Sequence, residues 1–177
     1  MRPLVDRDRL TRFLSELGRR VRAPTRLYLV GGASAVVEGW RASTADIDFV
    51  AEPESRALLE SLPDLKQQLD VSVEFASPAH FVPELPGWRD RSPWVEQHGV
   101  IQVYHYDFVS QAVAKIERGH RQDLEDARRM IASKVDVTRL QELVAQTRGE
   151  LVRYPAVDAN VFQAKIDAFL ESIEGEA

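Results

Sequence analysis

The sequence contains no cysteine, no long apolar run and little excess charge of either sign. Without a thiol, disulfide bonds, cysteine-ligated zinc and a cysteine nucleophile are all excluded. No apolar stretch approaches the roughly 18 residues that a membrane helix needs. Residues 1–12 are too charged to resemble a secretory signal. These absences favour a cytoplasmic protein with no membrane partner.

The composition is that of a folded chain, with 177 residues of which 44% are hydrophobic and 29% charged. The net charge of −5 argues against binding nucleic acid through overall positive charge. The charge is segregated, however: residues 1–26 carry an excess of +5 and residues 45–90 an excess of −7. The basic segment could contact a polyanion or a partner protein, or form an oligomer surface, and the acidic segment could attract cations. Solvated helix faces are the simpler alternative.

Hydrophobic periodicity predicts a mixture of helices and strands. The expected strands cover residues 26–30, 46–50, 71–75 and 100–104. The expected helices cover residues 4–22, 33–40, 54–68, 108–118, 121–132, 136–148 and 158–172. The proline-rich residues 76–99 are expected to form a long ordered loop. We therefore expect an α/β (α+β) fold, a small mixed sheet flanked by helices over residues 1–106, followed by a helical part over residues 107–177.

The strand expected at residues 46–50 carries two aspartates, Asp46 and Asp48. Residues i and i+2 of a strand project from the same face, roughly 7 Å apart at ~3.3 Å per residue. Carboxylates spaced in this way can bind one or two Mg²⁺ ions. Glu74, in the next expected strand, supplies a third carboxylate that points away from the apolar residues of its strand. The alternative is three solvated acids at the edge of a sheet.

Gly31 and Gly32 come directly after a predicted strand and open a predicted helix. Glycine permits a close approach of the backbone to a ligand, and free N–H groups at such a turn can bind phosphate. A tight turn without a ligand is the alternative. The segment is neither a P-loop, which needs Gly-Lys-Ser/Thr, nor a G-x-G-x-x-G fingerprint.

Taken together, Val30-Gly31-Gly32-Ala33, Arg41-Ala42-Ser43-Thr44, Asp46-Ile47-Asp48 and Glu74 resemble the minimal nucleotidyltransferase fold of the DNA polymerase β superfamily. Lys115-Ile116-Glu117-Arg118, followed by Asp123-Leu124-Glu125-Asp126, is similar to a helical element of bacterial nucleotidyltransferase-like families that include the AbiEii-type toxins. The resemblance covers residues 26–131. It departs from the pattern at Gly32, where many members have serine; the nearest serine here is Ser34.

The resemblance implies a role for each of these residues. Asp46, Asp48 and Glu74 would hold two Mg²⁺ ions, with Glu74 as an alternative general base. Gly31, Gly32, Ser34 and Arg41 would bind the nucleotide, although Arg41 could instead brace the loop. Lys115 or Arg118 would face the triphosphate, unless both are exposed helix residues. Asp123 and Asp126 are expected to do no more than cap a helix.

The implied activity is a Mg²⁺-dependent transfer of a nucleoside monophosphate from an NTP to a hydroxyl group of RNA, protein or a small molecule. The resemblance also suggests a toxin–antitoxin component with an antitoxin-like partner. A catalytically inactive module of the same fold, which binds nucleotide, RNA or a partner protein, is the alternative. Trp88 and Trp94 could stack on a base or a sugar, or could be buried and hold the proline-rich loop in place.

Overall fold

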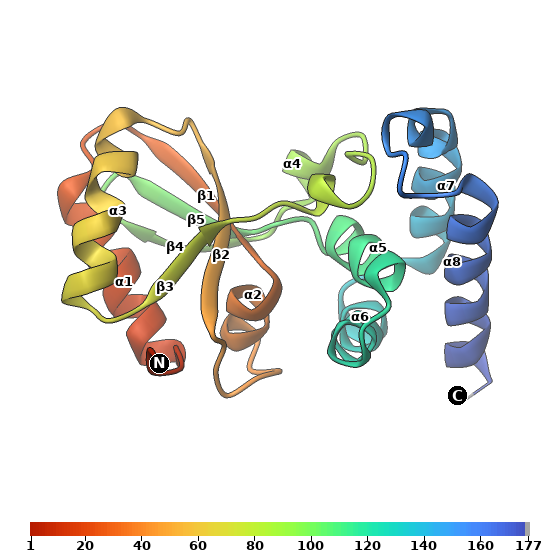
Figure 1. The fold of residues 1–177 in the computed structure, drawn as a ribbon, viewed down its shortest axis with the longest axis horizontal. Coiled ribbons are helices and arrows are strands. Elements are labelled where there is room, and N and C mark those ends of the chain that lie inside the picture. The colour runs from red at the N-terminus through yellow and green to blue at the C-terminus, as the bar shows by residue number, and fades with distance from the viewer. Residues whose placement is uncertain (176–177) are drawn as a thin grey trace. The chain divides into compact units, whose positions relative to one another are not determined.

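The computed structural model describes residues 1–175, and the chain divides into two compact units. The first unit comprises Met1–Ser77 and Ser92–Tyr106, and the second comprises Pro78–Arg91 and the chain from Asp107 onward. Each unit is recognisable in Figure 1 by its elements, strands in the first and helices only in the second. Within the described residues, no helix has the length and apolar character needed to cross a membrane.

A five-stranded mixed sheet forms the centre of the first unit. Its strands are β1 (Thr25–Val30), β2 (Asp46–Glu52), β3 (Ser72–Phe75), β4 (Trp94–His98) and β5 (Ile101–His105), in the order β3-β2-β1-β5-β4. The pairs β1–β5 and β2–β3 are parallel, whereas β1–β2 and β4–β5 are antiparallel. The expected small mixed sheet flanked by helices is confirmed.

Two helices cover one face of this sheet, α1 (Arg7–Arg20) and α3 (Arg56–Gln68), as Figure 1 shows. Buried and half-buried residues alternate along β2 because successive side chains of a strand point to opposite faces. The core under the helices is built mainly from the buried set of the central strands: Leu27, Leu29, Ile47, Phe49, Ile101 and Val103. The other set, which includes Asp46 and Asp48, therefore lies on the opposite face.

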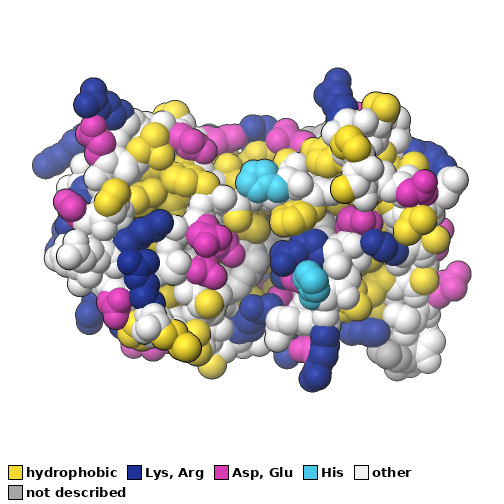
Figure 2. Space-filling view, viewed as in Figure 1, with side chains coloured by type: hydrophobic (Ala, Val, Ile, Leu, Met, Phe, Trp, Pro, Cys, Tyr) yellow, Lys and Arg dark blue, Asp and Glu magenta, His cyan; other side chains and the backbone are white. Residues whose placement is uncertain are grey.

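The arginine-rich start of the chain is partly neutralised by acids from elsewhere in the first unit. The ion pairs are Arg2–Asp70 (3.8 Å), Arg7–Glu96 (3.2 Å) and Arg20–Asp64 (3.9 Å). Figure 2 shows basic and acidic side chains intermingled on the drawn face. Segregation of charge along the sequence thus becomes pairing of charge in space.

The second unit is helical. Its main helices are α5 (Phe108–Arg118), α6 (Arg121–Ser133), α7 (Val137–Thr147) and α8 (Ala159–Glu174). Shorter pieces are the 3₁₀ helices η1 (Pro78–His80) and η2 (Arg148–Arg153) and the single turn α4 (Trp88–Arg91). Aspartates cap α5, α7 and α8, since each accepts hydrogen bonds from backbone N–H groups of the first turn. All four long helices begin and end within two residues of their predicted bounds.

The expectation of a continuous loop over residues 76–99 is wrong. This segment contains η1, α4 and the strand β4, which pairs with β5 across the turn at Gly99 (φ +59°). The prolines of this segment all lie before β4. They gave no sign of the strand, because β4 is stabilised by pairing with β5 rather than by its own composition. Of the two tryptophans, Trp88 is buried and Trp94 is 60% exposed.

Candidate metal and phosphate site

Asp46, Asp48 and Glu74 lie on the sheet face opposite α1 and α3. In the parallel pairing of β2 and β3, Asp48 is the direct neighbour of Glu74, and Asp46 is the neighbour of Ser72. Opposed residues of neighbouring strands share a face, so the three carboxylates project on the same side. Asp46 and Asp48 are half-buried, and Glu74 is exposed.

The carboxylates are spread along the two strands rather than gathered at one point. In the part of the chain that the structure describes, no three His, Cys, Asp or Glu side chains form a group that could hold a metal ion. Within residues 1–175, the side chains of Asp46 and Glu74 make neither a hydrogen bond nor an ion pair. The donor set nevertheless suits Mg²⁺, which retains several waters and commonly needs only one or two protein carboxylates.

The glycine turn lies beside this acidic face. Gly31 has φ +58°, a conformation that glycine adopts at little cost, and a Cβ built on it would lie 3.5 Å from Asp48 Oδ2. A Cβ at Gly32 would collide with the Thr44 hydroxyl and lie 2.8 Å from Thr44 Cβ and 3.4 Å from Arg41 Nη1. The fold therefore brings the glycine turn, the 41–44 loop and Asp48 together, as the sequence predicts.

A buried polar chain holds the helix that follows the turn, α2 (Gly31–Val37). The Ser34 hydroxyl lies 2.7 Å from His105 Nδ1, and His105 Nε2 lies 2.8 Å from Glu38 Oε1. The Glu38 carboxylate can only accept, so the ring proton belongs on Nε2. Ser34 has no exposed surface, and its hydroxyl is not presented to solvent. In the sequence, only the four-residue spacing of Ser34 and Glu38 hinted at this polar chain. That spacing places both on one helix face but does not identify His105 as the residue between them.

Lys115 lies in a buried cluster inside the second unit. Its ammonium is 3.1 Å from Asp123 Oδ1 and 2.9 Å from Asp126 Oδ2, and Arg118 Nε lies 3.4 Å from Asp123 Oδ2. The expectation that Asp123 and Asp126 only cap a helix is wrong, because the N-cap of α6 is His120 and both carboxylates bind Lys115. Lys115 is not an exposed helix residue either. Its contact with a triphosphate stays a prediction, as does that of Arg118.

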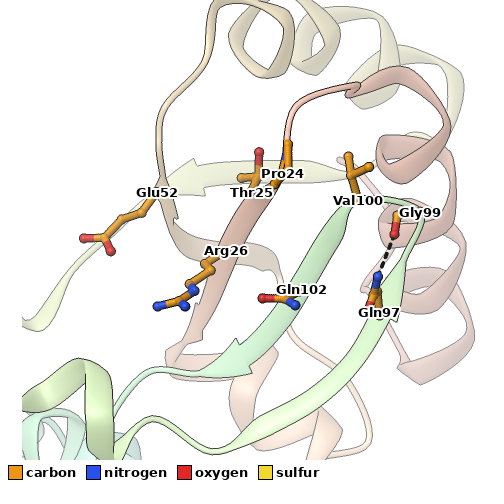
Figure 3. A pocket seen from close by; sticks show the side chains of 8 residues that line it. All are labelled: Pro24, Thr25, Arg26, Glu52, Gln97, Gly99, Val100 and Gln102. Atoms are coloured by element: carbon orange, nitrogen blue, oxygen red, sulfur yellow. Dashed lines mark hydrogen bonds between the residues drawn. The ribbon is translucent and has the colours of Figure 1, made fainter.

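A polar row crosses the same sheet face at the other end of β2. Strand register places Glu52, Arg26 and Gln102 side by side, and Gln102 pairs with Gln97 on β4. Figure 3 shows these side chains around a cavity of about 450 Å³, with a hydrogen bond of 2.9 Å from Gln97 Nε2 to the Gly99 carbonyl. A hydrogen bond with Tyr28 raises the pKa of Arg26. Alternation along each strand predicts which residues share this face. The row itself forms only because four strands pair side by side.

A mixed sheet that carries an aspartate pair beside a glycine turn is the arrangement expected of nucleotidyltransferase-like proteins. The chain belongs to the family described as "Nucleotidyltransferase of unknown function (DUF6036)", whose model matches residues 8–171. Neither a curated protein nor a solved structure matches the chain. Membership of the nucleotidyltransferase superfamily is thereby confirmed, and the relationship to AbiEii-type toxins stays a prediction.

Proposed function

We propose that this protein is a Mg²⁺-dependent nucleotidyltransferase that moves a nucleoside monophosphate from an NTP to a hydroxyl acceptor. The observation that carries the proposal is the row of carboxylates Asp46, Asp48 and Glu74 beside the turn at Gly31 and Gly32. The family description supports the reaction class, and the metal, the nucleotide and the acceptor are our inference.

In the proposed reaction, the acceptor oxygen attacks the α-phosphorus and the bond to the leaving pyrophosphate breaks. Asp46 and Asp48 would hold Mg²⁺, which would neutralise charge on the triphosphate. Glu74 would complete the metal site or accept the proton of the acceptor hydroxyl. The backbone at Gly31 and Gly32 would approach the β- and γ-phosphates.

The structure suggests more specific roles for Ser34 and Arg41. Because the Ser34 hydroxyl is bonded to His105, we assign Ser34 to holding α2 in place behind the glycine turn. The Arg41 guanidinium lies next to the turn, with Nη1 3.4 Å from the position of a Cβ built on Gly32. Phosphate contacts would then come from the glycine backbone and Arg41.

The acceptor is proposed to be RNA, a protein or a small molecule. The cytoplasmic location, an oligomeric state and a toxin–antitoxin role with an antitoxin-like partner belong to the same proposal. The location rests on the composition, and the oligomeric state and the toxin–antitoxin role rest on the sequence resemblance and on the basic first helix.

The test is incubation of the full chain with Mg²⁺ and each NTP labelled at the α-phosphate, together with total cellular RNA or protein. We expect label to enter an acceptor, and no label from γ-labelled NTP, because pyrophosphate leaves. Asp46→Asn/Asp48→Asn should abolish labelling, while Asp64→Asn, an exposed acid on α3, should not. Undiminished labelling by the double variant would contradict the proposal.

A non-catalytic nucleotide-binding module is the second candidate. It is favoured by the absence, within residues 1–175, of a converged three-carboxylate group and by the burial of Ser34. Titration calorimetry with Mg²⁺ and each NTP, combined with a pyrophosphate assay, separates the two. Binding without release of pyrophosphate would support the module.

A further inference from the structure

A second cavity, of about 510 Å³, lies wholly within the helical unit. Its walls come from the end of η1 and the residue after it (His80 and Phe81), from the end of α5 (Glu117 and Arg118), and from the end of η2 and the four residues after it (residues 153–157). The volume is within the range of roughly 300–1,000 Å³ typical of sites for small ligands. None of these residues belongs to the carboxylate row on β2 and β3.

Two arginines line the cavity, and one of them has no acidic partner among the described residues. Arg118 Nε lies 3.4 Å from Asp123 Oδ2, and the terminal nitrogens of Arg118 make no hydrogen bond within residues 1–175. Arg153 makes neither a hydrogen bond nor an ion pair with any described residue. The one acid of the lining, Glu117, is neutralised by Lys165, whose ammonium lies 3.1 Å from Glu117 Oε1. An arginine without an acidic partner, next to a second arginine whose terminal nitrogens make no hydrogen bond, suits a phosphate group.

The cavity also offers an aromatic surface. Phe81 is 41% exposed, and the Arg118 guanidinium lies 4.9 Å from its ring centre. The Tyr154 hydroxyl donates to the Ala79 carbonyl at 2.9 Å, which ties the segment after η2 to the segment that carries Phe81. An exposed ring beside a guanidinium plane is the kind of platform on which a nucleobase stacks.

We propose that this cavity binds a nucleotide, with the base stacked on Phe81 and the phosphate paired with Arg118 and Arg153. The combination of an exposed aromatic ring with two arginines indicates the class of ligand. An inorganic anion would satisfy the arginines but leave Phe81 uncovered, and an uncharged aromatic molecule would leave Arg153 unpaired. The site needs neither a metal ion nor the carboxylates of the first unit, so it does not rest on the transfer reaction.

The test measures binding of AMP, GMP, CMP and UMP to the full chain in the presence of EDTA and at low salt. We expect at least one monophosphate to bind about tenfold more tightly than both its nucleoside and inorganic phosphate. Arg153→Ala and Arg118→Ala should each weaken that binding about tenfold, the loss expected from a charge-assisted hydrogen bond. Phe81→Leu, which retains apolar volume, should weaken binding of the monophosphate and leave binding of inorganic phosphate unchanged.

Arg121→Ala is the matched control, because Arg121 is an exposed arginine of the same unit outside the cavity. It should bind as the wild type does, and so should Asp46→Asn/Asp48→Asn. Inorganic phosphate binding as tightly as the monophosphates would overturn the proposal in favour of a simple anion site. Loss of binding in the double aspartate variant would overturn it too, by assigning the nucleotide to the first unit. The assay contains no divalent ion and no turnover, so failure of the labelling experiment leaves this inference standing.

Discussion

Two of the closely spaced aspartate pairs in the chain have opposite surroundings. Asp46 and Asp48 lie two residues apart on β2, half-buried and next to a glycine turn. Asp123 and Asp126 lie three residues apart on α6, buried against the Lys115 ammonium. The same side chain is thus partly exposed to solvent in one unit and joins two helices in the other.

The difference follows from the cost of removing charge from water. A carboxylate that is buried away from water needs a cation or hydrogen-bond donors beside it, because an unpaired buried charge costs several kcal/mol. Asp126 is fully buried and its charge is compensated by Lys115, whereas the two aspartates on β2 are half-buried and keep contact with solvent. Of the two pairs, we therefore propose only the half-buried one on β2 as a cation site.

Lys115→Met is expected to have the largest effect on stability. The change leaves the buried Asp126 charge without its ammonium, so the free energy of unfolding should fall by about 3–5 kcal/mol. Urea unfolding followed by circular dichroism measures it. Lys115→Met/Asp123→Asn/Asp126→Asn removes the charges as well and should recover part of the loss. A fall of less than about 1 kcal/mol in the single variant would break the comparison between the two pairs.

Gly32→Ala should have the next largest effect. The added methyl would collide with Thr44, so the turn or the 41–44 loop must shift, at a cost of about 1–3 kcal/mol. The proposed nucleotide labelling should fall with it, because the turn is displaced relative to Asp48. Gly149→Ala is the control, since a Cβ there meets no atom within 4 Å. Equal melting temperatures for the two variants would contradict the close packing at the turn.

Tyr154→Phe should cost about 1 kcal/mol at neutral pH, through loss of the hydrogen bond to the Ala79 carbonyl. Burial, followed by the nearby Glu150 and Glu84 charges, raises the pKa of Tyr154. The native state thus retains the phenol proton more strongly, so this stabilisation is complete below the unfolded-state pKa near 10 and is lost as pH rises through the folded-state pKa. Unfolding measured from pH 8 to pH 11 should show a smaller alkaline loss in the variant. An identical pH dependence would contradict the raised pKa.

Asp46→Asn/Asp48→Asn should have the smallest effect on stability, below about 1 kcal/mol. Both side chains are half-buried, and the amides keep their size. Mg²⁺ should raise the melting temperature of the wild type and leave that of the double variant unchanged, because a ligand that binds only the native state stabilises it. If this variant is as unstable as Lys115→Met, the β2 aspartates are structural.

Most of the fold could be predicted because its signals are local. Alternation along residues 46–50 identified β2, and the glycines at 31 and 32 marked the end of β1. The strand β4 could not be predicted, because proline obscured it and its partner β5 stabilises it. The position of Glu74 beside Asp48 likewise depends on the pairing of β2 with β3.

The sequence by itself determined which residues can carry chemistry and on which face of their own strand or helix they lie, because backbone periodicity sets both. Only the tertiary structure decided which of them are available to a ligand. It buried Ser34 against His105, enclosed Lys115 between two aspartates, and left Arg153 without a hydrogen bond or ion pair among the described residues. The physical reason is that burial and pairing are properties of neighbours in space, which residues distant in the chain supply.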